Sequence, residues 1–190
     1  VIEDRDPIVP NFLNWFHANS RGYVIRRELL FGRGDGYDVD RVSESERNLR
    51  SLRQLSAVMI VPLRTSDPDT VDVLVIAKDV WSLRLNSNYR IINGELELLL
   101  LQPAEENLAG THRRLLGNFI YEPDTLTFGG RFMDPRMAGS RIAWAADANV
   151  IVNQESGDPE GSYGLVQYGL PLYSTEQEWA WGAAAGWHTE

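Results

Sequence analysis

The chain of 190 residues contains no cysteine, which excludes disulfide scaffolds, thiolate metal sites and cysteine nucleophiles. It has no apolar run near the roughly 18 residues that a membrane-spanning helix needs. Basic residues are in the minority: 18 Lys and Arg against 27 Asp and Glu give a net charge of −9, which argues against a nucleic-acid binder. His17, His112 and His188 show no metal-ligand spacing, and there is no Gly-x-Ser-x-Gly nucleophile elbow. We therefore expect no enzyme, no metal site and no cofactor.

The second half of the chain consists of short segments in which apolar residues alternate with small or polar ones. In the segment 141–150, Trp144, Ala146 and Val150 would share one strand face, and Asp147 and Asn149 the other. A period of two over about ten residues is typical of a transmembrane β-barrel strand. We predict strands at 81–91, 95–102, 112–121, 125–133, 140–152, 163–173 and 177–187.

The connections between these predicted strands alternate between short turns and longer loops, and outer-membrane barrels show such an asymmetry between their two ends. Seven strands that face lipid cannot stand alone, because an open sheet leaves backbone groups unpaired in hydrocarbon. We therefore expect the chain to be the N-terminal part of a larger barrel protein. The alternative is a soluble β-rich domain whose tryptophans fill a core.

The first part of the chain has a different period. A strand is predicted at 11–18, and Ser20 is a plausible cap for a helix in which Tyr23, Arg27 and Leu30 recur at helical spacing. A second helix is predicted at 39–52, and two strands at 57–63 and 71–77. The predicted order is therefore β-α-α-β-β.

These segments resemble a known module. Residues 15–31, which include the run Ile25-Arg26-Arg27-Glu28-Leu29, resemble the opening of a POTRA domain, the polypeptide-transport-associated module. The turn at 34–38, the helix at 45–50 and the strand at Val58 follow in the usual POTRA order. Residues 106–111 and 134–140 resemble early turns of the barrel that follows POTRA modules in the BamA/TamA/FhaC superfamily of outer-membrane insertases and secretion pores.

The resemblance implies an α+β POTRA module at 1–79, in the periplasm, followed at 80–190 by antiparallel transmembrane β-barrel strands that form an incomplete barrel in the bacterial outer membrane. One departure is that the family's Arg-Gly-Tyr/Phe motif on a late loop is missing, since Arg21-Gly22-Tyr23 lies in the wrong place. The implied function is assembly and insertion of β-barrel proteins. A two-partner-type secretion pore and a soluble β-rich binding domain are the alternatives. The implied partners are unfolded outer-membrane or secreted client proteins, membrane lipid and accessory envelope lipoproteins.

Three groups of residues follow as candidate sites. The POTRA-like strand is expected to offer a free edge for client strands, unless Pro62 blunts it. The first barrel strand is polar and a weak strand former, so it is expected to form a seam, with an ordinary lumen-facing strand as the alternative. The client edge comprises Val58, Met59, Ile60 and Val61; the seam comprises Trp81, Leu83, Leu85, Asn86 and Asn88; the membrane-interface anchors are Trp144, Trp179, Trp181 and Trp187.

Overall fold

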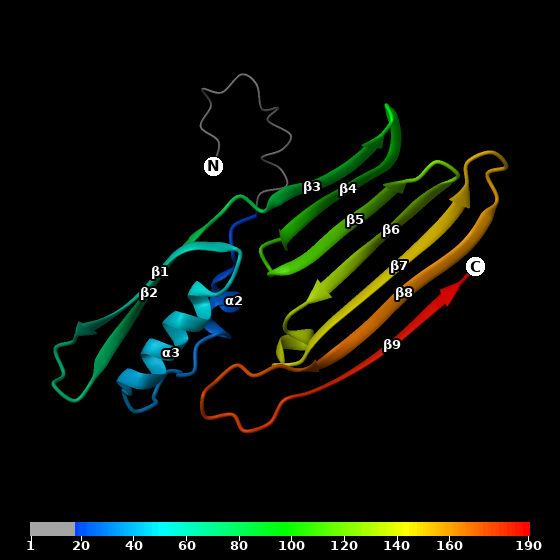
Figure 1. Cartoon of the computed structure of the whole chain (residues 1–190). Coiled ribbons are helices and arrows are strands. Elements are labelled where there is room, and N and C mark those ends of the chain that lie inside the picture. Colours follow the sequence, from blue (N-terminus) through cyan, green and yellow to red (C-terminus); the bar gives the residue numbers. More distant parts are fainter. Residues whose placement is uncertain (1–17) are drawn as a thin grey trace, which may run out of the picture.

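The computed structural model describes residues 18–190 as an α/β unit beside a large antiparallel sheet (Figure 1). The α/β unit, residues 18–79, contains α2 (Gly22–Arg26), α3 (Val39–Arg50), β1 (Leu55–Arg64) and β2 (Val71–Asp79). The strand predicted at 11–18 lies outside the described residues except for Ala18, which belongs to no strand. The second helix and both later strands of the prediction are confirmed within a few residues.

The α/β unit is held together by one small core. β1 and β2 form an antiparallel hairpin, and α3 packs on one of its faces. Asp38 caps α3 by accepting hydrogen bonds from the backbone N–H groups of Asp40 and Arg41, and Arg50 lies in the last turn, where a cation suits the helix dipole. The core residues are Val42, Leu49, Leu55, Val58 and Ile60.

The first predicted helix is much shorter than its periodicity indicates. α2 spans only five residues, and Arg21, whose side chain makes no capping hydrogen bond, stands at its N-terminus in place of Ser20. The chain turns away after Arg27 because the backbone N–H of Leu30 donates to the Ser45 hydroxyl on α3, at 2.9 Å. The prediction that Ser20 caps this helix is wrong, and its hydroxyl has another use.

The second half is a seven-stranded antiparallel meander in the order β3 to β9, so the predicted strand order is confirmed (Figure 1). β4 runs six residues past its predicted end, and β9 begins four residues later than predicted, because residues 171–180 form a loop. The strands are β3 (Leu83–Ile92), β4 (Glu95–Leu108), β5 (Arg113–Tyr121), β6 (Thr125–Asp134), β7 (Ala143–Asn153), β8 (Pro159–Leu170) and β9 (Trp181–Thr189), with a short 3-10 turn, η1 (Met137–Gly139), before β7.

The register gives this sheet two chemically different faces. Phe119, Phe128 and Val150 are cross-strand partners on one face, whereas Asn118 and Asn149 flank Gly129 on the other. Phe128 is 48% exposed, so the described chain leaves its apolar face uncovered, as a lipid-facing surface would be. The apolar face carries Leu115, Phe119, Phe128, Phe132, Val150 and Val166; the polar face carries Asn86, Gln102, Asn118, Arg131, Asp147, Asn149 and Gln167.

The connections alternate in length, and the longer ones lie beside the α/β unit. Loops 109–112, 135–142 and 171–180 are at that end, and the turns 93–94, 122–124 and 154–158 are at the other. All three of the longer loops contact the α/β unit. No helix among residues 18–190 is long and apolar enough to cross a bilayer.

Candidate functional site

β3 is an edge strand of the large sheet. It pairs with β4 on one side, and no other strand of residues 18–190 pairs with its outer edge. The predicted seam residues divide between the two faces: Leu83 and Leu85 lie on the apolar face, and Asn86 and Asn88 on the polar face, while Trp81 precedes the strand. An edge of this kind presents backbone N–H and C=O groups that another strand can pair with.

β1 presents a second strand edge, which is partly blunted. Val58 and Ile60 are buried against α3, Met59 lies on the opposite face, and Val61 is half-buried. The Arg50 guanidinium donates to the carbonyl of Val58 at 3.2 and 3.3 Å. Since backbone groups of alternate residues point to opposite edges, Val58, Ile60 and Pro62 share the edge that faces away from β2. A client strand there would meet one occupied carbonyl and, at Pro62, no donor.

The α/β unit and the large sheet meet at a joint formed by the loops 109–112, 135–142 and 171–180. In its first contact, the backbone N–H and the hydroxyl of Ser20 donate to the Asp79 carboxylate. His112 is 2% exposed, and its Nε2 lies 2.6 Å from the same hydroxyl oxygen. Asn107 donates to the carbonyl of Ala18 and accepts from the backbone N–H of His112, so these residues join the unit to the end of β4.

The protonation of this cluster follows from its geometry. The Ser20 proton goes to the Asp79 carboxylate, so neutral His112 donates its Nε2 proton to the Ser20 oxygen. Burial, together with the Arg27 guanidinium, lowers the pKa of His112 to about 4. Serine stands between the acid and the imidazole, so the three residues do not form the acid–imidazole–hydroxyl relay of a hydrolase. The three residues instead link the α/β unit to the end of β4.

The second contact of the joint is a buried ion network around Glu28. Its side chain is 6% exposed and forms a bidentate pair with the guanidinium of Arg136 on the β6–β7 loop. Arg141 lies 3.7 Å from the same carboxylate, donates to the carbonyl of Leu29, and stacks on Tyr173 with 4.5 Å to the ring centroid. Buried charges in proteins are found paired in this way because an isolated one is expensive.

The third contact attaches α3 to the β8–β9 loop. The buried Glu44 carboxylate accepts hydrogen bonds from the backbone N–H and hydroxyl of Thr175, at 2.6 and 3.1 Å. Asn48, one turn further along α3, donates to the carbonyl of Tyr173 at 2.7 Å. The joint therefore uses α3, the residues on either side of α2 and every loop at this end of the sheet.

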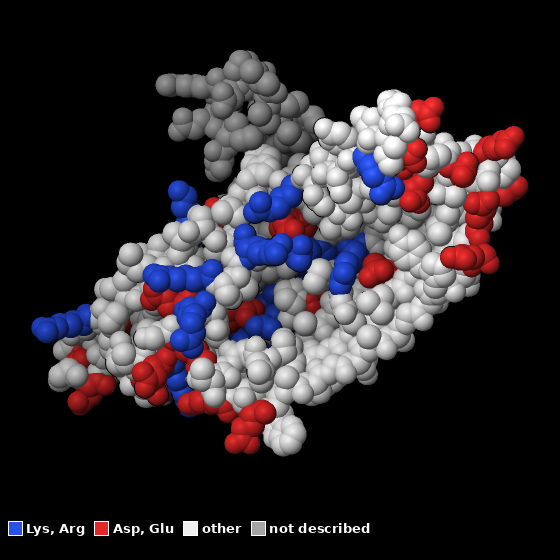
Figure 2. All heavy atoms as spheres, viewed as in Figure 1, with Lys and Arg blue, Asp and Glu red and all other residues white. Residues whose placement is uncertain are grey.

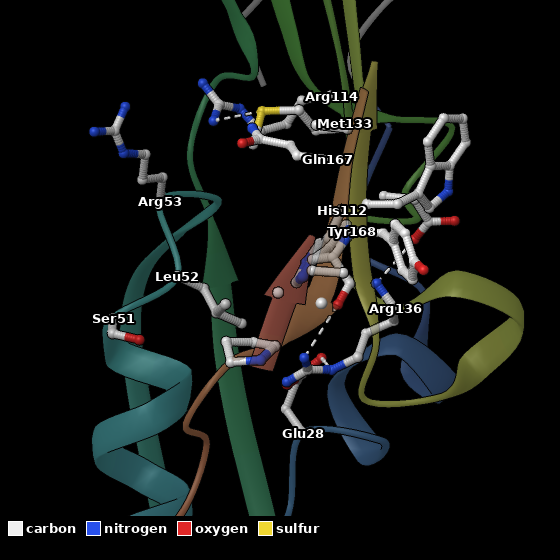
Figure 3. Close-up of a pocket in the computed structure, with 18 of the residues that line it drawn as sticks. Glu28, Ser51, Leu52, Arg53, His112, Arg114, Met133, Arg136, Gln167 and Tyr168 are labelled. Atoms are coloured by element: carbon white, nitrogen blue, oxygen red, sulfur yellow. Dashed lines mark hydrogen bonds and ion pairs between the residues drawn. The ribbon is translucent and has the colours of Figure 1, made fainter. Parts of the chain in front are cut away.

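A cavity of about 690 Å³ lies between the α/β unit and the base of the polar face. Arg136 and Glu28 meet at one side of it, and residues 51–53 line the other (Figure 3). The α/β unit thus contacts the loops without filling the space beside the sheet. The lining includes Leu52, Arg53, His112, Arg114, Met133 and Gln167.

Comparisons with known proteins support the fold. No family model and no curated protein matches the chain. Among solved structures, it is similar to the crystal structure of BamA from Haemophilus ducreyi lacking POTRA domains 1–3, with a TM-score of 0.65 and 13% sequence identity. The match covers 90% of this chain and 33% of that one, so this chain spans about a third of its length. The large sheet therefore has the fold of part of a BamA-like barrel.

Four aromatic residues on the apolar face of the BamA-like sheet lie at the end next to the joint. Trp144 lies against Phe132, with 5.3 Å between ring centroids, and Tyr168 against Trp181 at 5.6 Å, all on the apolar face. Trp187, also on the apolar face, lies over Gly164 further along β9. Trp179 precedes β9 and is 78% exposed. Among the predicted anchors, three thus share the apolar face and one does not.

Charge is divided along the sheet of this chain. Arginines gather where the sheet meets the α/β unit, and acidic side chains gather at the opposite end (Figure 2). Within residues 18–190, no cluster of His, Asp and Glu could hold a metal ion. Sequence reasoning did not find the joint, although it singled out the segment 134–140 that contains Arg136. The acidic residues at the far end are Glu95, Glu122, Asp124, Glu155, Asp158 and Glu160.

Proposed function

We propose that the chain belongs to an outer-membrane factor that assembles β-barrel proteins, by docking unfolded client strands and inserting them through a seam at β3. The observation that carries this proposal is an open β3 edge in a sheet with the fold of part of BamA. Residues 1–79 would act as a POTRA-like module in the periplasm, with β1 as an additional edge for clients. Lipid would cover the apolar face, and accessory envelope lipoproteins are further proposed partners.

The mechanism requires backbone pairing and no covalent chemistry. A client strand would add to the β3 edge, where main-chain hydrogen bonds give affinity with little dependence on sequence. Its apolar side chains would continue the apolar face toward lipid, and its polar ones would continue the polar face. The joint would hold the α/β unit in one orientation relative to that edge.

The proposal is tested with the full-length natural protein. It should be recovered in the outer membrane and migrate differently in unheated and boiled gel samples. In proteoliposomes it should speed the folding of a urea-unfolded barrel client, read by the client's own heat-dependent gel shift. Protein-free liposomes are the control, and equal client folding rates with and without the protein would refute the proposal.

A two-partner-type secretion pore is the second candidate, favoured by the polar face, on which Arg131 and Asp147 approach to 4.0 Å. It predicts ion conductance in planar bilayers and loss of a single exoprotein after gene deletion. A soluble β-rich binding domain predicts recovery in the aqueous phase without detergent.

A further inference from the structure

One register row of the polar face is polar on nearly every strand. It begins at Asn86 on the β3 edge and continues through Gln102 and Asn118. Gly129 on β6 is the one position in the row without a side chain. The full row is Asn86, Gln102, Asn118, Gly129, Asn149, Tyr163 and His188.

The amides in this row form a directional chain of hydrogen bonds. Asn86 donates to Gln102 at 2.9 Å, Gln102 donates to Asn118 at 3.1 Å, and Asn118 donates to Asn149 at 2.9 Å. The last link crosses β6 at Gly129, where a Cβ atom would lie 2.1 Å from the Asn149 Oδ1. The absence of a side chain at Gly129 is therefore what allows the chain to cross β6.

The chain of amides ends with an unused acceptor at the open edge. Asn86 uses its NH2 group on Gln102, and no hydrogen bond within residues 18–190 reaches its Oδ1. The next strand outward can extend the row only if it places a hydrogen-bond donor opposite Asn86. Asparagine, glutamine, serine and threonine have such donors.

Outside Asn86, β3 specifies pairing register less well: Asn88, the other amide on the polar face, lies opposite Leu100, and no hydrogen bond within residues 18–190 fixes its side chain. A shift of one residue would exchange the two faces of an incoming strand and is strongly disfavoured. A shift of two residues keeps the faces, and the apolar face of β3 offers apolar side chains at Leu83, Leu85, Tyr89 and Ile91, interrupted only by the small Ser87. A polar side chain that must be satisfied can decide between such registers, as single buried asparagines do in coiled coils.

We propose that Asn86 selects the register of the client strand that adds to β3, by pairing with a strand that carries an amide or hydroxyl side chain on its polar face. This inference rests on the proposed function, because it takes β3 as the client-docking edge. The favoured clients are amphipathic β-strands with one such residue at the matching position, and the register follows that residue when it is moved.

Disulfide mapping on full-length protein in proteoliposomes tests the inference, and these 190 residues contribute no competing cysteine. Arg84→Cys places a thiol on the polar face, two residues from Asn86. Single cysteines are placed along the matching face of the last strand of a barrel client that has one Asn there, and disulfides are located by mass spectrometry. The disulfide yield at one client position should exceed the yield at the positions two residues away by about fivefold, which is the effect of one typical hydrogen bond. Moving the client Asn by two residues should move that position by two.

Variants separate the role of Asn86 from general damage. Asn86→Leu should spread the disulfides over several positions, and Asn86→Gln should restore a single one. Asn88→Leu, the same substitution two residues along on the same face, is the matched control and should leave the distribution narrow. A distribution that stays narrow in Asn86→Leu overturns the inference and leaves the proposed function standing.

Two other outcomes are decisive. An added small thiol reports whether the cysteine of the Arg84→Cys variant is reactive. If it is reactive but forms no disulfide with any client position, docking at β3 is refuted, and the proposed function with it. Disulfides only to a strand of the protein itself would assign the amide row to closure of its own barrel, which overturns the inference about clients.

Discussion

Glu28 is the residue on which the joint between the α/β unit and the sheet most depends. Its buried carboxylate is the shared partner of Arg136 and Arg141. Removing one member of a buried ion network leaves uncompensated charge, so Glu28→Gln should lower the free energy of unfolding by about 3 kcal/mol. Urea unfolding of the protein in detergent micelles, followed by tryptophan fluorescence, measures this change.

Glu46 provides the control for that prediction, because it pairs with the largely exposed Arg50 within α3. Glu46→Gln should lower the free energy of unfolding by less than about 1 kcal/mol. Equal effects of the two substitutions would show that the network around Glu28 contributes no more than a surface ion pair.

Gly129 should be intolerant of any side chain. In Gly129→Ala the new methyl group would meet the Asn149 amide and the carbonyl of Ala148, at 2.1 and 2.3 Å. We expect a loss of about 1–3 kcal/mol, the usual cost of overpacking, measured by the same urea unfolding. Gly182→Ala is the control, since its methyl group would have only an ordinary 3.7 Å contact with the carbonyl of Tyr168. If both variants were equally stable, the row of amide side chains would have space for a methyl group where it crosses β6.

His112 should make the joint sensitive to acid. The folded pKa of about 4 lies below the ordinary value of 6.5, so between these values the unfolded chain binds the proton more strongly. The contribution of neutral His112 is therefore fully present above pH 6.5 and lost as the pH falls toward 4, by at most about 3 kcal/mol. Unfolding free energies of wild type and His112→Gln across this range should differ in slope, and parallel curves would contradict the prediction.

The residues of the joint could not be predicted from the sequence. Glu28 and Arg136 are 108 positions apart, and they meet only because α2 ends early and the β6–β7 loop folds toward it. Helical periodicity indicated a longer helix at Tyr23 to Leu30, and the hydrogen bond from Leu30 to Ser45 overrode it. A local sequence pattern carries no information about contacts between residues so far apart in the chain.

At the scale of elements, alternation along the strands was the reliable signal. It predicted each strand of the large sheet. It also predicted both faces of β7, in which Asp147 and Asn149 point to one face and Trp144 to the other. It was weaker at strand ends. β4 continues through Pro103 to Leu108, past the predicted end, because pairing with β3 and β5 sustains a strand that its polar sequence disfavours.

The hairpin of β1 and β2 offers a sharp test of which face is buried. Ile60 on β1 is 7% exposed and Ile76 on β2 is 50% exposed, and they lie on opposite faces of neighbouring strands. Ile60→Ala should lower the free energy of unfolding by about 3 kcal/mol, because it loses buried apolar surface and leaves a cavity. Ile76→Ala should lower it by less than about 1 kcal/mol. Urea unfolding compares them, and a larger effect at Ile76 would mean that a partner covers the outer face.

For the whole molecule, the sequence predicted the order of the two units but not how they meet. The polar and apolar periods placed an α/β unit before a barrel-like sheet, and the likeness to part of BamA agrees with that sheet. The loops that alternate in length could be counted from the sequence. Their role could not, because the longer loops contact the α/β unit through residues far apart in the sequence.

The apolar face makes a final prediction about the protein in lipid. If that face contacts the bilayer, bromines on lipid acyl chains should quench the tryptophans on it and spare Trp179, which lies in the β8–β9 loop. Trp187→Phe, on the apolar face away from the joint, should therefore reduce the quenchable part of the fluorescence, whereas Trp179→Phe should reduce only the unquenched part. Identical effects of the two substitutions would place both side chains in the same environment. An apolar face that shows no quenching would have to be covered by protein, which is the arrangement of a soluble domain.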